Sequence, residues 1–187
     1  MRRRIRVFPI PLFLLVIPIV IPHTGTLRAQ PSQAADSTNP CGAPEYRQFD
    51  FWIGEWNVMT PNGEVGGRSS IEREYNGCLI VENWAGPTGV PAGTSQNFYD
   101  KTDGKWRQNW IDGQASNPLW LEGNLDAGGA MVMTDSDPSA NPFNRITWTP
   151  NPDGSVRQHW ETSTDGGATW STAFDGLYVP RQGAAGG

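Results

Sequence analysis

Short apolar segments alternate with clusters of turn-forming residues along most of the chain. From residue 52 to residue 180, segments rich in Trp, Tyr, Phe, Val, Ile and Thr are separated by groups of Pro, Gly, Asn and Asp. This rhythm is typical of antiparallel strands, and apolar residues do not recur at helical spacing over the length of a major helix. The pattern predicts strands near residues 52–60, 66–75, 78–85, 93–100, 105–112, 118–124, 129–135, 143–149, 154–163 and 169–180.

The residues between the predicted strands indicate how the strands connect. Residues 103–104 and 153–154 read Asp-Gly, and residues 165–167 read Asp-Gly-Gly. Such residues tolerate the positive φ that tight turns require, so consecutive strands are expected to form hairpins. A short helical turn over residues 44–51 is expected to plug one end of the fold.

The number of strands narrows the fold class. An antiparallel sheet exposes two edges unless it closes, and closure into a barrel removes both. We therefore predict an all-β fold, a single antiparallel β-barrel of about ten strands, with a β-sandwich as the alternative. A barrel of this strand number is wider than its side chains can fill, so we expect it to enclose a cavity.

Two segments share a sequence pattern. Residues 103–110 and 153–160 both read D-G-x-x-R-Q-x-W, which indicates a turn followed by an outgoing strand. Successive side chains of a strand point to opposite faces. This alternation predicts that Trp106, Gln108 and Trp110 share one face of their strand. It predicts the same for Val156, Gln158 and Trp160 in theirs. The opposite faces are expected to carry Arg107, Asn109, Arg157 and His159.

The first 29 residues have the features of a secretory signal peptide. Residues 2–6 contain four arginines, and residues 7–22 are apolar but interrupted by four prolines. A membrane-spanning helix needs about 20 apolar residues, so we expect cleavage after Ala29 rather than anchoring. The protein is therefore predicted to be exported, to the periplasm or outside the cell.

The chain after the signal peptide divides into three parts. Residues 30–40 contain no apolar residue larger than alanine, and we expect them to form a disordered leader. Residues 41–181 are predicted to form the barrel domain, which is enough chain for one core. Residues 182–187 are small and glycine-rich and are expected to form a flexible tail.

Cleavage changes the charge of the protein and hence the partners it can have. The whole chain carries −5, but five of its 14 basic residues lie within residues 1–29 and all 19 acidic residues lie beyond them. The remainder has nine basic and 19 acidic residues, a net charge of −10. Such a domain repels phosphate backbones and anionic lipid. We therefore expect no nucleic-acid or membrane partner and a small-molecule ligand instead, while the oligomeric state is left open.

The chain has two cysteines, Cys41 and Cys78. In an oxidising compartment they are expected to form one structural disulfide. On the chain-entropy model, closing this loop contributes about 4 kcal/mol. There is no Cys-x-x-Cys spacing, and His159 is the only histidine after residue 29. No metal site is therefore expected.

Residues 163–170 match the Asp-box pattern S-x-D-x-G-x-T-W. The segment resembles the turns of sialidase-like propellers, where the pattern recurs several times. Here it occurs once, in a chain too short for a propeller. We interpret it as structural: Asp165 accepts backbone hydrogen bonds across the turn, and Trp170 packs over the hairpin.

The segment Phe49-Asp50-Phe51-Trp52-Ile53-Gly54-Glu55-Trp56 contains a G-x-W tripeptide at the start of the first predicted strand. Together with Cys41-Gly42-Ala43-Pro44, it resembles an uncharacterised exported bacterial family with lipocalin- or calycin-like barrels. The resemblance covers most of residues 41–181. It implies that Trp56 closes one barrel end and that Arg181 is a candidate for the basic residue that packs across it.

Ten strands are closer to nitrobindin-like barrels than to the eight of lipocalins. That resemblance implies haem ligation through a histidine, for which His159 is the candidate. A lone strand histidine beside charged residues is more often solvated or hydrogen-bonded. We therefore expect no cofactor, with haem as the alternative.

Nine tryptophans lie within residues 52–170, more than packing usually requires. Most are expected in the core, and some are expected to line a ligand site, together with amide side chains. The candidate ligand-binding residues are Trp56, Trp84, Gln108, Trp110, Gln158 and Trp160.

We expect a non-catalytic binding protein for a small, largely apolar ligand held in the barrel. The main alternative is a carbohydrate-binding module that uses exposed tryptophans. A third possibility is an enzyme with an acid/base pair drawn from Glu82, Glu122 and Glu161. The chain has no G-x-S-x-G elbow or phosphate loop, so no catalytic residue is assigned.

Overall fold

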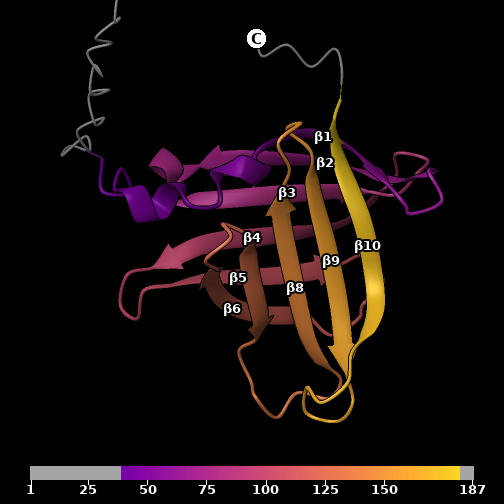
Figure 1. Ribbon diagram of the computed structural model, residues 1–187. Coiled ribbons are helices and arrows are strands. Elements are labelled where there is room, and N and C mark those ends of the chain that lie inside the picture. The colour runs from indigo at the N-terminus through magenta and orange to yellow at the C-terminus, as the bar shows by residue number, and fades with distance from the viewer. Residues whose placement is uncertain (1–38, 182–187) are drawn as a thin grey trace, which may run out of the picture. The chain divides into compact units, whose positions relative to one another are not determined.

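The barrel fold predicted from the sequence is confirmed. The computed structural model describes residues 39–181, so the predicted signal peptide, most of the leader and the tail lie outside the described residues. Ten antiparallel strands form a closed barrel in the order β1-β10-β9-β8-β7-β6-β5-β4-β3-β2 (Figure 1). The β-sandwich alternative is wrong, because β1 pairs with both β2 and β10. Closure leaves the sheet no free edge.

Each predicted strand range overlaps one observed strand. The strands are β1 (Gly54–Met59), β2 (Val65–Glu74), β3 (Leu79–Ala85), β4 (Pro91–Asp100), β5 (Lys105–Asp112), β6 (Leu119–Leu125), β7 (Met131–Asp135), β8 (Phe143–Pro150), β9 (Val156–Ser163) and β10 (Ser171–Pro180). Three short 3-10 helices accompany them: η1 (Pro44–Arg47), η2 (Asp50–Trp52) and η3 (Tyr75–Gly77). Within residues 39–181, no helix is long and apolar enough to cross a membrane.

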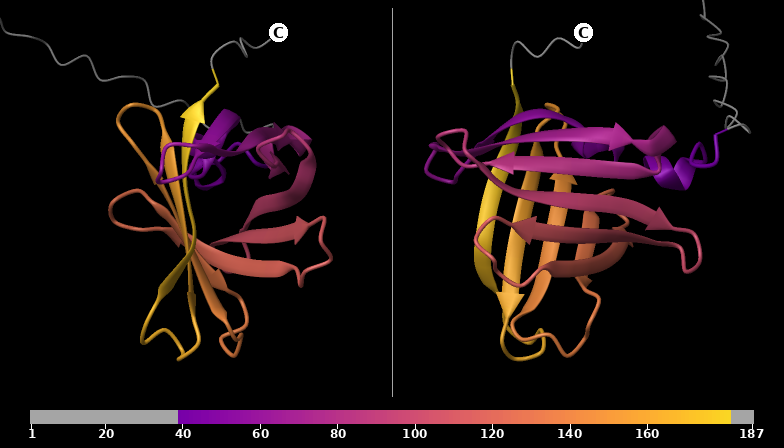
Figure 2. Two further views of the ribbon diagram at one scale, coloured as in Figure 1. Left: turned by 90° about the vertical axis from the view of Figure 1, so that its right-hand side faces the viewer. Right: turned by 180° about the vertical axis from the view of Figure 1, so that it is seen from behind.

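Consecutive strands form hairpins, as the turn residues predict, and one long-range pairing closes the barrel. In that pairing Trp56 lies opposite Pro180, and Met59 lies opposite Leu177. Strands β8 to β10 run across the direction of β3 to β6, and this crossing wraps the sheet around its interior (Figure 2). Beside the closing pair, Arg181 forms an ion pair with Glu55, the residue before Trp56.

The segment that contains η1 and η2 plugs one end of the barrel, as predicted. Phe49 and Trp52 have no exposed surface, and their rings stack with centroids 5.0 Å apart. Both pack against Trp148 of β8. Because large aromatic side chains bury the most apolar area, this cluster is the main core of the protein.

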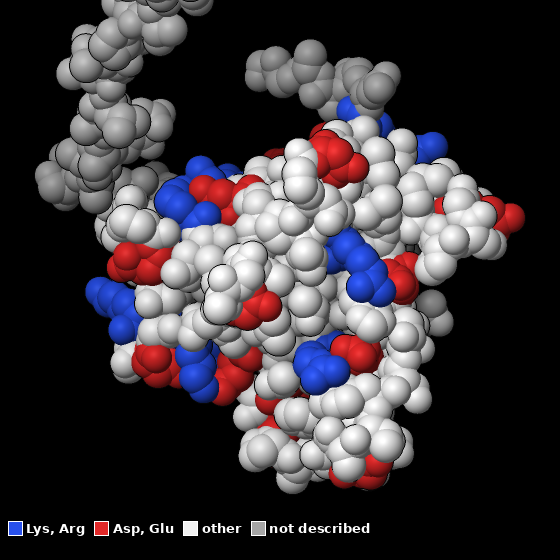
Figure 3. Space-filling model, viewed as in Figure 1, with Lys and Arg blue, Asp and Glu red and all other residues white. Residues whose placement is uncertain are grey.

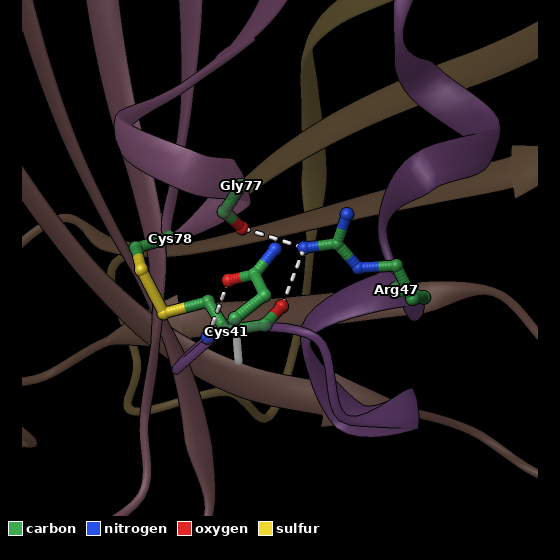
Figure 4. Close-up of a disulfide and its surroundings, with 5 residues drawn as sticks. Cys41, Arg47, Gly77 and Cys78 are labelled. Atoms are coloured by element: carbon green, nitrogen blue, oxygen red, sulfur yellow. Dashed lines mark hydrogen bonds between the residues drawn. A yellow bond between two sulfur atoms is a disulfide. The ribbon is translucent and has the colours of Figure 1, made fainter. Parts of the chain in front are cut away.

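The disulfide between Cys41 and Cys78 holds the plugging segment to the start of β3, which confirms the predicted pairing. The two Cα atoms are 5.1 Å apart. The Arg47 guanidinium donates hydrogen bonds to the carbonyl oxygens of Cys41, at 2.9 Å, and Gly77, at 2.6 Å (Figure 4). The plug is therefore held by the disulfide and by hydrogen bonds to Cys41 and to Gly77, the residue before Cys78.

Charged side chains on the outer face of the barrel are arranged in opposite pairs. Arg145 of β8 pairs with Glu161 of β9, and Arg157 of β9 pairs with Asp175 of β10. Basic and acidic groups accordingly lie side by side on this face (Figure 3). Exposed pairs of this kind contribute roughly 0–1 kcal/mol each, so the fold depends mainly on its interior.

Candidate functional site

A cavity of about 180 Å³ lies inside the barrel, on the side away from the plugged end. Strands β3, β5 and β9 run from the plugged end toward the opposite end, and each contributes one polar and one aromatic residue. The aromatic residue follows the polar one by two positions, so it lies farther from the plug on the same face. The lining residues are Glu82, Trp84, Gln108, Trp110, Leu119, Ile146, Gln158, Trp160, Phe174 and Tyr178.

Glu82 of β3 lies at the polar floor of this cavity. Its side chain is 4% exposed. Its Oε1 atom accepts hydrogen bonds from the Ser69 hydroxyl at 2.8 Å and the Tyr178 hydroxyl at 3.3 Å. Its Oε2 atom accepts one from the Ser95 hydroxyl at 3.1 Å. Three neighbouring elements therefore hold the carboxyl group in one orientation.

The hydrogen bonds continue from Glu82 to both glutamines of the cavity. On one side, Asn97 donates to Ser95 at 3.0 Å, and Gln108 donates to Asn97 at 2.7 Å. On the other side, the single Tyr178 hydroxyl proton is shared between Gln158 Oε1, at 2.6 Å, and Glu82 Oε1, at 3.3 Å. A buried network that satisfies its polar groups fixes side-chain positions. The polar floor is therefore a preorganised surface.

Burial raises the pKa of Glu82 from its ordinary value of 4.5 to about 7, and the hydrogen bonds from Ser69, Ser95 and Tyr178 only partly oppose this shift. Burial, and next the charge of Glu82, also raises the pKa of Tyr178 well above its usual range. Within residues 39–181, the lining contains no Lys, Arg or His. The ionised form of Glu82 therefore lacks an opposing charge in the cavity.

An aromatic rim surrounds the outer part of the cavity. It consists of Trp84, Trp110, Trp160 and Phe174. The rings of Trp84 and Phe174 meet edge to face, with centroids 6.0 Å apart. The Trp160 indole donates a hydrogen bond to Asn144 Oδ1 at 2.8 Å, which fixes its orientation.

Two glycines on neighbouring strands make room for rim tryptophans. A Cβ atom at Gly67 would lie 2.3 Å from the ring of Trp84, and one at Gly93 would lie 2.4 Å from the ring of Trp110. Contacts this short require a shift of the ring or of the strand. The absence of a side chain at these two positions therefore determines where the indoles lie and how wide the cavity is.

Five of the six ligand-site candidates from the sequence line this one cavity. The two D-G-x-x-R-Q-x-W segments supply four of them, since each places its glutamine on the floor and its tryptophan on the rim. The predicted alternation is thereby confirmed for both strands. The five residues are Trp84, Gln108, Trp110, Gln158 and Trp160.

Trp56 differs from the other five candidates. It faces the interior at the plugged end, where its indole donates to the Trp52 carbonyl oxygen at 3.0 Å and its ring packs against Tyr178. Trp56 is therefore part of the core beneath the cavity. Sequence reasoning missed Phe174 and Tyr178, although both have the inward parity of the predicted last strand. It considered Glu82 only as an acid/base candidate.

The three carboxylates proposed for an acid/base pair do not meet. Glu82 faces the cavity, whereas Glu122 forms ion pairs with Lys105 and Arg107, and Glu161 pairs with Arg145. The parity of their strands places Glu122 and Glu161 outside the barrel. The arrangement can orient a bound molecule, but these residues offer no pair for acid/base catalysis.

His159 also lies on the outer side of its strand, between the inward-facing Gln158 and Trp160. Its Nε2 atom is 3.0 Å from the Thr172 hydroxyl oxygen. His159, the candidate haem ligand, therefore does not face the cavity. Within residues 39–181, no group of His, Cys, Asp or Glu side chains is arranged to hold a metal ion.

The tryptophans do not form a platform on the outer face. Of the nine, all within the described residues, Trp120 alone is well exposed, at 60%. The carbohydrate-binding alternative relies on exposed tryptophans, and residues 39–181 offer only Trp120 for it. Comparison of the chain with protein-family models and with curated proteins finds no match.

Proposed function

We propose that this protein is a non-catalytic binding protein that holds one small, largely apolar ligand inside its barrel. The cavity itself carries the proposal: aromatic and aliphatic groups form its walls, and a few fixed polar groups form its floor. This combination is the common form of a small-molecule site, in which apolar contacts give affinity and polar groups give orientation.

The volume of the cavity supports a ligand of about one ring. A cavity of about 150 Å³ accommodates benzene, whereas drug-sized ligands occupy roughly 300–1,000 Å³. At about 180 Å³, the cavity suits a single ring with a small substituent or a compact branched group.

We further propose that the protein acts outside the cytoplasm, in the periplasm or beyond it. The disulfide supports this, because such bonds persist in oxidising compartments. The signal-like residues 1–29 support it independently. The G-x-W tripeptide and the closed ten-stranded barrel support membership of the exported lipocalin-like group that residues 41–58 resemble.

The proposal is tested by calorimetric titration of the purified protein with neutral one-ring compounds: toluene, phenol and indole. We expect saturable binding of at least one of them with 1:1 stoichiometry. Trp110→Ala should weaken that binding about 10- to 100-fold, because a buried aromatic contact contributes about 1.5–3 kcal/mol.

Trp120→Ala is the matched control, since it removes an indole from the outer face. Its affinity should stay within twofold of the wild type. Absence of saturable binding for the whole panel would contradict the proposal. Equal losses in the two variants would also contradict it, because the binding would then lie outside the cavity.

A further inference from the structure

Within residues 39–181, the cavity lining contains one acidic group, Glu82, and no basic group that could pair with it. Glu82 is bonded by Ser69 from β2, Ser95 from β4 and Tyr178 from β10, and the network continues to Asn97 of β4, Gln108 of β5 and Gln158 of β9. None of them is basic, and Tyr178, the only other titratable group among them, stays neutral because its pKa is raised. A buried carboxylate without a counter-charge is costly. The site therefore favours a ligand that supplies positive charge.

The hydrogen bonds that Glu82 already accepts indicate which type of cationic ligand suits the cavity. Both carboxyl oxygens already accept hydrogen bonds from Ser69, Ser95 and Tyr178. The carboxylate therefore has hydrogen-bond donors but no positive charge beside it among the described lining residues. A cation without N–H groups, such as a methylated ammonium, supplies that charge and leaves the three hydrogen bonds intact.

The aromatic rim suits the same group. Three tryptophans and a phenylalanine line the cavity together with Glu82. Faces of aromatic rings attract cations, and tryptophan does so most strongly. Cages of such rings recognise quaternary ammonium groups, whose charge is spread over apolar methyls. A trimethylammonium group is also compact enough for a cavity of about 180 Å³.

We propose that the cavity binds a small methylated ammonium ion, with its charge against Glu82 and its methyl groups against Trp84, Trp110 and Trp160. This inference rests on the proposed function and names the ligand class of the same site. The carboxylate selects the cation, and the rim selects its apolar surface. A ligand that carries a carboxylate of its own is disfavoured, because the lining formed by the described residues has no basic group to pair with it.

Binding of such a cation depends on the ionisation of Glu82. The pKa of this carboxyl is about 7 in the free protein, and a permanent cation binds only the ionised form well. Affinity should therefore rise with pH and level off above neutrality. Between pH 8 and pH 5 the loss should approach about 100-fold, because each unit below the pKa reduces the ionised fraction tenfold.

The test compares two ligands of equal shape, choline and 3,3-dimethylbutan-1-ol, in which a tert-butyl group replaces the trimethylammonium group. At pH 8 and moderate salt, calorimetry of the wild-type protein should show choline binding at least tenfold tighter than the alcohol. Choline does not titrate, so its affinity should fall toward pH 5. The affinity of the alcohol should not fall.

Glu82→Gln should weaken choline binding at least tenfold and leave the alcohol within threefold of the wild type. Glu122→Gln is the matched control, because it removes an acidic charge from the outer face and should change neither affinity. If Glu82→Gln does not fold, as judged by circular dichroism, the pH dependence of the wild type still decides the question.

The possible outcomes separate this inference from the proposed function. If the alcohol or the neutral one-ring compounds bind as tightly as choline, the ammonium inference fails and the apolar cavity site stands. If Glu122→Gln weakens choline binding as much as Glu82→Gln, the attraction is a general charge effect and the inference also fails. If no probe binds the folded protein, both proposals fail.

Discussion

Glu82 places a carboxyl group in the interior of the barrel, where its side chain is 4% exposed. Its carboxyl group is held by Ser69, Ser95 and Tyr178 in an interior that otherwise excludes charge. The donated hydrogen bonds favour the ionised form, but burial penalises that form and outweighs them. The residue therefore lowers stability at neutral pH, as residues kept for a function often do.

The free energy of unfolding should fall as pH rises from about 4.5 to above 7. In that window the unfolded carboxyl ionises near its ordinary pKa of 4.5, while the folded one stays protonated up to about 7. The difference amounts to about 3 kcal/mol at pH 8 relative to pH 4.5. Glu82→Gln should remove this dependence and be more stable than the wild type at pH 8. Urea denaturation at pH 5 and pH 8 measures both.

Other carboxyl groups do not obscure that experiment. The pKa of Asp165 is lowered to about 2, chiefly by hydrogen bonds from Thr169. A lowered pKa contributes stability that is complete above the unfolded value and is lost only as pH falls below it. Such groups act below the window in which Glu82 acts. An unchanged pH slope in Glu82→Gln would show that the carboxyl is not buried as described.

At the scale of single elements, the turn between β9 and β10 behaves as its Asp-box pattern predicts. Asp165 accepts hydrogen bonds from the Thr169 backbone at 2.8 Å and the Thr169 hydroxyl at 2.6 Å. The Trp170 indole donates to the Gly167 carbonyl oxygen, and the Arg145 guanidinium lies 3.9 Å from the centre of the Trp170 ring. The motif therefore stabilises the turn between β9 and β10, at the barrel end opposite the plug.

The pairing of β4 with β5 depends on Gly93. Gly93→Ala should lower the free energy of unfolding by about 1–3 kcal/mol, because overpacking forces rigid groups apart. The new Cβ atom would meet the Trp110 ring at 2.4 Å and the Ile111 carbonyl oxygen at 3.0 Å. The shift of Trp110 should also change tryptophan fluorescence and weaken ligand binding.

Gly86→Ala is the control for this prediction. Gly86 lies between β3 and β4, and a Cβ atom there would have no neighbour within 4 Å. Its stability should stay within about 0.5 kcal/mol of the wild type, the usual range for surface substitutions. Equal effects of the two substitutions would mean that backbone entropy, and not contact with Trp110, makes Gly93 important.

At the scale of the whole molecule, the plug and the cavity divide the barrel interior between them. Phe49, Trp52 and Trp148 fill one end without exposed surface, whereas the other end retains the cavity. The stability of the plug therefore determines whether the floor of the site stays in place. The disulfide connects that plug to β3, the strand that carries Glu82.

Replacement of both cysteines, Cys41→Ser with Cys78→Ser, should lower the free energy of unfolding by about 4 kcal/mol on the chain-entropy model. The residues are separated by 37 positions, so the bond restricts a long loop in the unfolded chain. Guanidinium denaturation of the double variant measures the loss. Reduced wild-type protein should give the same midpoint, and a midpoint equal to that of the oxidised protein would contradict the prediction.

Much of the fold could be predicted from local patterns in the sequence. Alternation of side chains along residues 105–112 and 154–163 predicts which residues face inward, because the period of two is a property of each strand alone. Turn chemistry predicts the hairpins for the same reason. Pairing of Cys41 with Cys78 needs only the count of cysteines and an oxidising compartment.

The site could be identified only from the tertiary structure. The alternation of a strand predicts which residues face inward, but not how far each lies from the plugged end of the barrel. Trp56 and Trp110 both face inward, yet Trp56 packs against the plug, whereas Trp110 lines the cavity. The register of the closing pair and the position of η2 decide this difference, and both are long-range features. The same features leave Glu82 facing a space that no cationic side chain of residues 39–181 lines.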